Sequence, residues 1–162
     1  MSANPSELDK LNELLKRFRF AMITTRNDVG SLVAHPLTVQ EHESDGDLWF
    51  IVGAHASVVD HVRHDPTVGV SFSSDDAWLS LSGEAEVVDD VERLRDLWSP
   101  SVDAWFPDGP EASDATIIRV TAFSGEYWDS PGGRIATAIA FLTAKVTGEH
   151  PGGGSENEKF DL

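Results

Sequence analysis

The sequence predicts a small antiparallel β-barrel with peripheral helices, a fold class that is mainly β with some helix (α+β). About six segments rich in β-branched and aromatic residues are separated by turn residues. They do not alternate regularly with helical patterns, which argues against a doubly wound parallel sheet. The chain has 162 residues, of which 40% are hydrophobic, enough for one domain with a sizeable core.

The individual elements follow from the spacing of apolar residues and from turn residues. Strands are predicted at residues 20–25, 31–40, 48–52, 67–73, 77–88 and 115–129. Helices are predicted at residues 6–18, 57–65, 89–98 and 134–147. We expect Pro36 to mark a sheet edge or a bulge, because proline cannot donate to a ladder, and Gly83 to mark a bulge or bend. Residues 99–113 are expected to be mostly loop, in which Trp105 and Phe106 must pack against something.

The stretch from residue 48 to residue 66 is the most informative. Its buried strand is broken by Gly53, and Ser57 stands where a helix N-cap is expected, with Asp60 three residues later as in a capping box. A strand that ends in a small-residue loop and opens a helix leaves backbone N–H groups pointing at one spot, here at residues 56–59. The pattern is typical either of a phosphate or other anion site or of a simple helix cap.

Composition excludes several classes of function. The formal charge is −16, and a general nucleic-acid binder needs a basic face, so we expect no nucleic-acid partner. No apolar run reaches membrane-spanning length and no signal peptide is visible, so we expect no membrane partner and a cytoplasmic location. The sequence has no cysteine, which excludes disulfides, zinc–thiolate sites and thiol catalysis.

The collected motifs resemble those of the general stress protein branch of the pyridoxamine 5′-phosphate oxidase-like, FMN-binding split-barrel superfamily. The matching segments run in family order from about residue 8 to residue 148. They are Phe20-Ala-Met-Ile-Thr-Thr25, His35-Pro36-Leu37, Leu48-Trp-Phe-Ile51, Val62-Arg-His-Asp-Pro66, Leu81-Ser-Gly-Glu-Ala-Glu86, Leu97-Trp-Ser-Pro100, Ala104-Trp-Phe-Pro107 and Glu126-Tyr-Trp-Asp-Ser-Pro131. Together they are specific for the fold and less so for activity.

The resemblance implies a six-stranded antiparallel split β-barrel that forms a homodimer and holds a flavin nucleotide in grooves between the subunits. The single domain would cover residues 1–148, and the polar, glycine-rich composition of residues 149–162 itself predicts a disordered tail. The backbone at Thr24, Thr25, His35, Pro36 and Leu37 would border the flavin ring. The loop from Val52 to Ser57 and the helix continuing at Val58 would take the ribityl phosphate, and Trp78 and Trp128 would approach from the partner subunit.

Two positions depart from the family pattern. The basic residue that usually precedes the proline of the second strand is His35, and the lysine that usually begins the central helix is Val58. A charge-assisted phosphate contact contributes about 1.5–3 kcal/mol, so the loss of one would weaken FMN binding by roughly tenfold to a hundredfold. Ser57, the helix N-terminus, and Arg63 or His55 are the candidates to compensate.

Several residues allow two interpretations. His35 either contacts the flavin or is a half-buried strand residue, and Trp78 and Trp128 either stack on the flavin or serve packing. Three histidines, His55, His61 and His64, lie close in sequence, but His61 and His64 look like surface partners of aspartates, so we expect no metal ligand. Trp49 and Trp98 are expected in the core.

No hydrolytic triad, P-loop or dinucleotide fingerprint is present, and we expect no dedicated catalytic side chain. The first functional hypothesis is an FMN-dependent oxidoreductase of unknown substrate, in which flavin carries the chemistry. The second is a non-catalytic stress-response protein that binds FMN, FAD, a deazaflavin or haem. The third is a dimeric barrel that has lost its cofactor.

Overall fold

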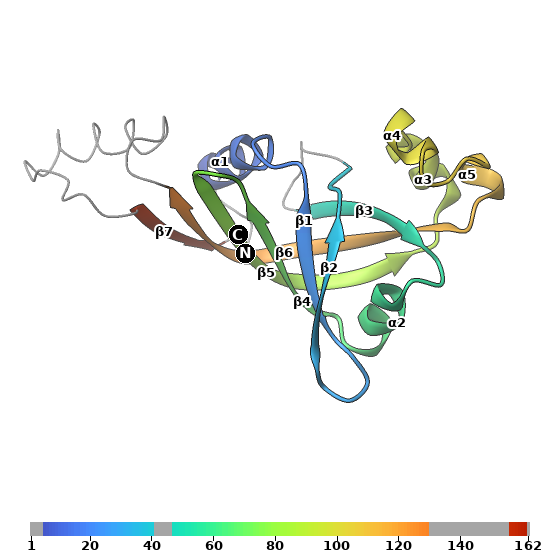
Figure 1. Ribbon diagram of the computed structural model, residues 1–162. Coiled ribbons are helices and arrows are strands. Elements are labelled where there is room, and N and C mark those ends of the chain that lie inside the picture. Colours follow the sequence, from blue (N-terminus) through green and yellow to red (C-terminus); the bar gives the residue numbers. More distant parts are fainter. Residues whose placement is uncertain (1–4, 41–46, 130–155, 162) are drawn as a thin grey trace, which may run out of the picture.

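The structure is a computed structural model that describes residues 5–40, 47–129 and 156–161 (Figure 1). Its helices are α1 (Pro5–Leu15), α2 (Ser57–His64), α3 (Val91–Leu97), α4 (Pro100–Asp103) and α5 (Gly109–Ala112). Its strands are β1 (Ala21–Arg26), β2 (Leu32–Leu37), β3 (Asp47–Gly53), β4 (Thr67–Ser73), β5 (Ala77–Val88), β6 (Ala115–Asp129) and β7 (Glu156–Asp161).

The strands form an antiparallel sheet that curls into a split barrel. Six strands follow the order β2-β1-β4-β5-β6-β3, and β7 pairs with β6 outside this path. The two ends of the path meet at a single bridge between Val39 and Phe50, with the Gln40 amide donating to the Trp49 carbonyl at 2.8 Å. The predicted antiparallel arrangement of six strands is therefore confirmed. Pro36 lies in β2, the edge strand of this path, as its missing N–H requires.

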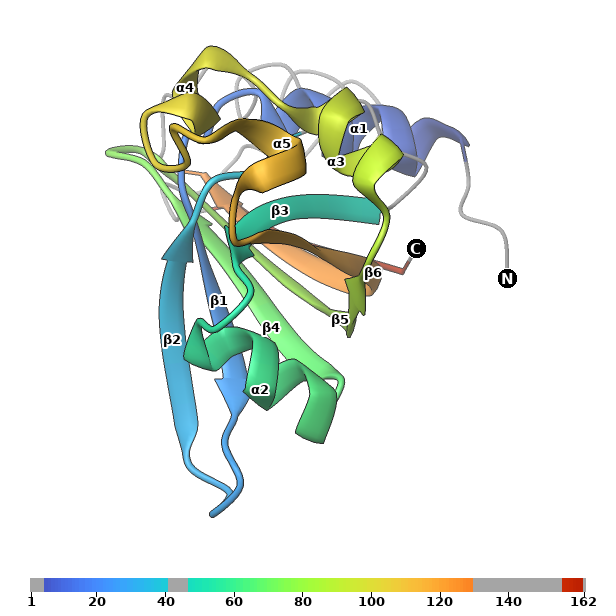
Figure 2. The same ribbon diagram turned by 90° about the vertical axis from the view of Figure 1, so that its right-hand side faces the viewer.

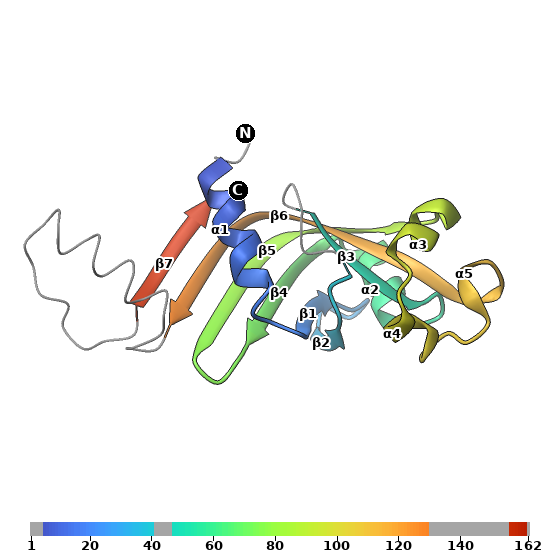
Figure 3. The ribbon, with the colours of Figure 1, turned by 90° about the horizontal axis from the view of Figure 1, so that it is seen from above.

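The inside of the curled sheet holds the core, and two helices cover it. Strands alternate between buried and exposed residues, as in β5, because one face packs inward and the other faces solvent. Helix α1 crosses the sheet (Figure 3) and buries Leu11 and Leu14. Phe18, just after the helix, is also buried, and its ring lies 5.5 Å from that of Phe72. Helix α2 lies beside β1 and β2 (Figure 2) and buries Val58, Val59 and Val62 in the same core.

A second, smaller core lies under helices α3 to α5 at one end of the sheet. Leu94 and Leu97 of α3 pack with Ile117 of β6, and Trp49 and Trp98 pack against them, in line with the expected core role of both tryptophans. Helix α3 starts at Val91, two residues later than predicted, because Asp90 is its N-cap and its side chain accepts hydrogen bonds from the Glu92 and Arg93 amides. The segment expected to be loop contains the short helices α4 and α5.

Gly83 makes the predicted bulge between β5 and β6. The register shifts between Ser82 and Gly83, and a Cβ atom at Gly83 would lie only 2.5 Å from the Thr121 carbonyl oxygen. Only glycine allows the two backbones to approach so closely. The bulge also separates two kinds of outer surface on β5, because the outward residues before it are uncharged and those after it are Glu84 and Glu86.

The structure differs from the sequence predictions at the C-terminus and in the loop before α5. Residues 156–161 of the expected disordered tail form β7, paired with residues 124–129 of β6. The helix predicted at residues 134–147 lies outside the described residues. Trp105 does not pack as expected within the chain, since 82% of it is exposed, whereas Phe106 packs against Trp98 with ring centroids 6.1 Å apart.

Candidate functional site

The loop between β3 and α2 forms the predicted anion site only in part. The helix begins at Ser57 with Ala56 as its N-cap, and no side chain caps it, so the predicted N-cap role of Ser57 is wrong. The Ala56 amide donates to the Gly53 carbonyl at 3.0 Å and the Val59 amide to the Ala56 carbonyl at 2.9 Å. Of the four amides at residues 56–59, those of Ser57 and Val58 have no hydrogen-bond partner in the described part of the chain.

The N–H groups of these two residues belong to the first turn of a helix and point out from its N-terminus. The helix dipole also favours an anion there. Their surroundings carry little positive charge. Asp60 lies in the same first turn, and the exposed His55 side chain faces Asp114, with Nε2 3.6 Å from a carboxylate oxygen. Arg63 lies in the last turn, six residues and roughly 9 Å along the helix from Ser57, so it is far from these amides.

The side chains of Val52 and Val58 do not face this anion site. Val52 is 4% exposed and Val58 is 2% exposed, and both belong to the main core. Ser57 instead exposes its side chain beside the two amides. A lysine in place of Val58 would therefore enter the core, whereas Ser57 is an exposed position next to the two amides.

A buried threonine joins two histidines between the β1–β2 hairpin and α2. The Thr25 hydroxyl lies 2.9 Å from His61 Nδ1 and 3.3 Å from His35 Nε2, and the two imidazole rings are 5.5 Å apart. Burial lowers the pKa of His35, and the neighbouring His61 lowers it further. His61 is thus a partner of Thr25 rather than a surface partner of Asp65, as its spacing had indicated.

The residues predicted to border a flavin ring divide between the two faces of the hairpin. Thr25, His35 and Leu37 turn toward the inside of the barrel, and Thr24 and Pro36 turn outward. Thr24 pairs with Ala34, and Met22 pairs with Pro36 in the ladder of β1 with β2. A planar ligand can therefore lie against the outward side chains or along the edge of β2. The His35 side chain lies on the opposite, inner face of the hairpin.

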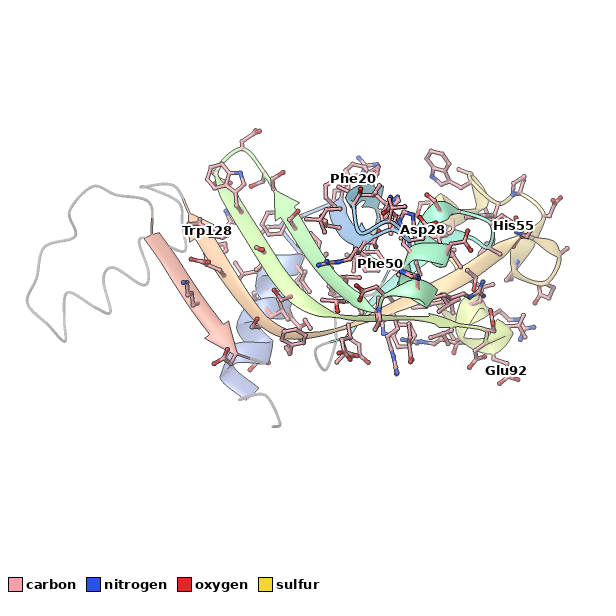
Figure 4. The ribbon with its side chains drawn as sticks, turned by 90° about the horizontal axis from the view of Figure 1, so that it is seen from below. Phe20, Asp28, Phe50, His55, Glu92 and Trp128 are labelled. Carbon is pink, nitrogen blue, oxygen red and sulfur yellow. The ribbon has the colours of Figure 1, made fainter. Side chains whose placement is uncertain are left out.

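Trp78 and Trp128 lie elsewhere on the same chain. They pair across β5 and β6 and line a hollow of 730 Å³ with Arg19, Phe20 and Met22, which we call the aromatic groove. Figure 4 places Trp128 near the end of β6 and His55, ahead of α2, at the opposite side of the molecule. Within one chain, the predicted site residues thus form two groups, one around the start of α2 and the hairpin and one in the aromatic groove.

Sequence reasoning missed the Thr25–His35–His61 cluster and the groove residues Arg19, Phe20 and Met22. The cluster joins residues 10 and 36 positions apart, so no local pattern points to it. The groove had a usable signal, since Phe20 and Met22 are large apolar residues at the start of a strand whose inward positions are Ala21 and Ile23.

Among the described residues, no helix is both long and apolar enough to cross a membrane. No group of three or more metal-binding side chains gathers within that part of the chain.

Comparison with known proteins places the chain in a family. The family model described as "Pyridoxamine 5′-phosphate oxidase like" matches residues 6–152, and the chain belongs to this family. No curated protein matches the sequence.

Solved structures of general stress proteins share the fold. A protein from Jannaschia sp. CCS1 assigned to general stress protein 26 is 25% identical, with a TM-score of 0.71 over 98% of this chain and 100% of that chain. A general stress FMN/FAD binding protein from Xanthomonas citri is also 25% identical, with a TM-score of 0.66 over 79% of this chain and 92% of that one. A Clostridium acetobutylicum protein related to general stress protein 26 shares the fold at 19% identity, with a TM-score of 0.72 over 98% of this chain and 96% of that one.

Proposed function

We propose that this protein is a flavin-binding member of its family that holds FMN in a site shared by two chains of a homodimer, in the cytoplasm. The observation that carries the proposal is the pair of unpartnered amides at Ser57 and Val58, in the first turn of a helix that follows a buried strand. Such amides donate to a phosphate without any side-chain cation. The flavin-binding relative from Xanthomonas citri supports the choice of ligand.

The phosphate would lie at the α2 N-terminus and the flavin ring along the outward side of β1 and β2, near Thr24 and Pro36. Because the inner residues Thr25 and His35 hydrogen-bond to each other, they would hold the backbone of this hairpin in place rather than touch the ring with their side chains. Binding would be weaker than with a lysine in the first turn, since Asp60 is the charged residue there. FAD and a deazaflavin remain alternative ligands with the same anionic tail.

The outer face of the sheet supports a homodimer. Eight outward positions at its centre carry no charge, and we call them the uncharged face: Met22, Thr24, Ala34, Pro36, Gly69, Ser71, Ser80 and Ser82. The ladder aligns them in two rows across β2, β1, β4 and β5, from Ala34 to Ser82 and from Pro36 to Ser80. A sheet face without charges is unusual for a surface that stays in water. A second copy seated there would bring its own Trp78 and Trp128 near the flavin.

Bound flavin would supply the electron or hydride transfer, and the protein would supply position and electrostatics. We therefore propose a flavin-dependent oxidoreductase of unknown substrate. A non-catalytic flavin-binding protein is the second candidate. It is favoured by Asp60 in the first turn of α2, which predicts weak binding of the flavin phosphate. Oxidation of NADPH in the presence of an acceptor separates the two, because only the enzyme turns over.

The phosphate site is tested by a substitution that removes one backbone N–H donor. Ser57→Pro removes one of the two amide donors at the first helical position, where proline is favoured. The preceding Ala56 already has φ −68° and ψ 141°, a conformation that a residue before proline adopts. Because a charge-assisted hydrogen bond contributes about 1.5–3 kcal/mol, fluorescence titration should give FMN binding roughly tenfold to a hundredfold weaker.

Ser57→Ala is the matched control, because it removes the hydroxyl and keeps the amide. Its FMN affinity should stay near that of the wild type, and riboflavin, which lacks the phosphate, should bind all three proteins equally. Equal FMN affinity in Ser57→Pro and Ser57→Ala would show that the phosphate does not sit at this helix.

A further inference from the structure

The two histidines joined by Thr25 lie one helical turn from the proposed phosphate site. His61 follows Ser57 by four residues on α2, and residues at this spacing lie on the same side of a helix with Cβ atoms about 5–6 Å apart. Side chains on a helix lean toward its N-terminus, which is the end where the Ser57 and Val58 amides have no partner in the described part of the chain. His35 of β2 is the neighbour of His61, with ring centroids 5.5 Å apart.

The Thr25 hydroxyl can bond to both rings after one of them is protonated. It lies 2.9 Å from His61 Nδ1, 3.3 Å from His35 Nε2 and 3.4 Å from the Val33 carbonyl oxygen. A hydroxyl group carries one proton and accepts two hydrogen bonds. When it donates to the Val33 carbonyl, it accepts one N–H from each ring. Protonation of either ring therefore breaks no hydrogen bond within the cluster.

A positive charge on this pair has no carboxylate partner. Among the described histidines, His55 is the one that forms an ion pair with a carboxylate. Burial and the adjacent His61 lower the pKa of His35 below its ordinary value of 6.5. His35 is therefore mostly uncharged at neutral pH in the free chain. An anion bound one turn above His61 would favour the charged form of the pair.

The other titratable side chains on the elements around the cluster do not supply this negative charge. Arg26 of β1 forms an ion pair with Asp65, with Nε 3.4 Å from a carboxylate oxygen. Glu84 and Glu86 of β5 lie on the outward face of the sheet. The remaining titratable side chains of α2 are exposed to water and carry opposite or variable charges: Asp60, Arg63 and His64.

We propose that the His35–His61 pair takes up one proton from solvent when the flavin phosphate binds, and so provides, as a function of pH, the cation that the first turn of α2 lacks. This inference rests on the proposed flavin function and adds its regulation by pH. Because the complex holds more protons than the free chain, FMN affinity rises on acidification. A second proton is disfavoured, since the two rings are neighbours.

Fluorescence titration of the full chain with FMN at pH 8 and pH 6 tests the proposal. The phosphate itself titrates near pH 6, but it does so with every variant, so the ratio of wild-type to variant affinity reports the protein. The double variant His35→Gln/His61→Gln cannot take up the proton. It should bind FMN as the wild type does at pH 8 and roughly fivefold more weakly than the wild type at pH 6.

The matched control is His55→Gln/His64→Gln, which removes two histidines outside the cluster, one in the loop before α2 and one in its last turn. Its affinity ratio to the wild type should be the same at both pH values. The proposal is overturned if the cluster variant keeps the wild-type pH dependence, or if the control loses it.

A proton count on the wild type alone avoids any effect of the substitutions on folding. Calorimetry at pH 7 in two buffers of different ionisation enthalpy should show net proton uptake with FMN, whereas a phosphate bound as the dianion would by itself release protons. Net release would overturn the proposal. Saturable FMN binding without the pH effect refutes this inference only, and no saturable binding at either pH refutes the proposed flavin function with it.

Discussion

Val58 shows at the scale of one residue why the missing cation cannot be restored by simple replacement. Its side chain is 2% exposed in the main core. Val58→Lys would bury a charge without a partner, so we expect chemical denaturation to show an unfolding free energy lower by about 2 kcal/mol or more. Ser57→Lys adds the same charge at the exposed position beside it and should leave stability nearly unchanged. Equal stability of the two variants would contradict the inward orientation of Val58.

His35 predicts a pH dependence of stability. Burial and the nearby His61 lower its pKa in the folded chain below the value of the unfolded chain. As pH falls, the unfolded chain therefore takes up the proton first, and the stability that His35 contributes above the ordinary histidine pKa of about 6.5 is lost on acidification.

Denaturation between about pH 7 and pH 5 should give a smaller loss of stability for His35→Gln than for the wild type. This range lies above the carboxylate titrations, so Asp65, whose pKa is lowered mainly by the backbone hydrogen bond from Thr67, does not contribute to the difference. Parallel pH profiles of the two proteins would refute the assignment.

At the scale of the elements, the close pairing of β5 with β6 at the bulge depends on one glycine. Gly83→Ala would place a Cβ atom 2.5 Å from the Thr121 carbonyl oxygen, and backbone must move to accept it. We expect an unfolding free energy lower by about 1–3 kcal/mol. The control is Gly53→Ala, also in a strand but outside the uncharged face, where the nearest atom is the Asp114 carbonyl oxygen at 4.0 Å. A Gly83→Ala variant as stable as Gly53→Ala would contradict the close packing.

Elements with strong local patterns could be predicted from the sequence, and those set by tertiary contacts could not. The alternation of Val68, Val70 and Phe72 predicts β4, and the helical spacing of Val91, Leu94 and Leu97 predicts α3. Strand β7 has the sequence ENEKFD, which lacks an apolar alternation, so only its pairing with β6 defines it. The N-cap of α2 is Ala56 and not the predicted Ser57. Although the side chain of Ser57 suits a cap, the last extended residue before the helix is Ala56.

The site shows the same division. The loop and helix at residues 53–64 could be predicted, since Gly53 and the valines of α2 leave a clear pattern. The hydrogen bonds that the Ala56 and Val59 amides donate within the chain could not be predicted, because they depend on how the loop packs. The inward orientation of the Val58 side chain had no sequence signal either. The same holds for Thr25 with His61, which are joined only when α2 packs on β1.

At the scale of the whole molecule, the uncharged face predicts the oligomeric state. Sedimentation of the wild type at micromolar concentration should give a dimer, because a stable interface needs about 800 Å² per partner and this face spans four strands. Ser82→Arg places a charge in the face and should shift the protein to monomer. Thr67→Arg, an outward residue of β4 outside the face and opposite Glu84, should remain dimeric. A wild-type monomer, or equal dissociation of both variants, would contradict the assignment.

The most direct test of the shared flavin site is an FMN titration of the wild type beside Ser82→Arg, followed by flavin fluorescence. The account predicts saturation at one FMN per chain in the dimeric wild type and a loss of affinity in the monomeric variant, with Thr67→Arg binding as the wild type does. Wild-type FMN affinity in a monomeric Ser82→Arg, or no saturable FMN binding in the wild type, would contradict it.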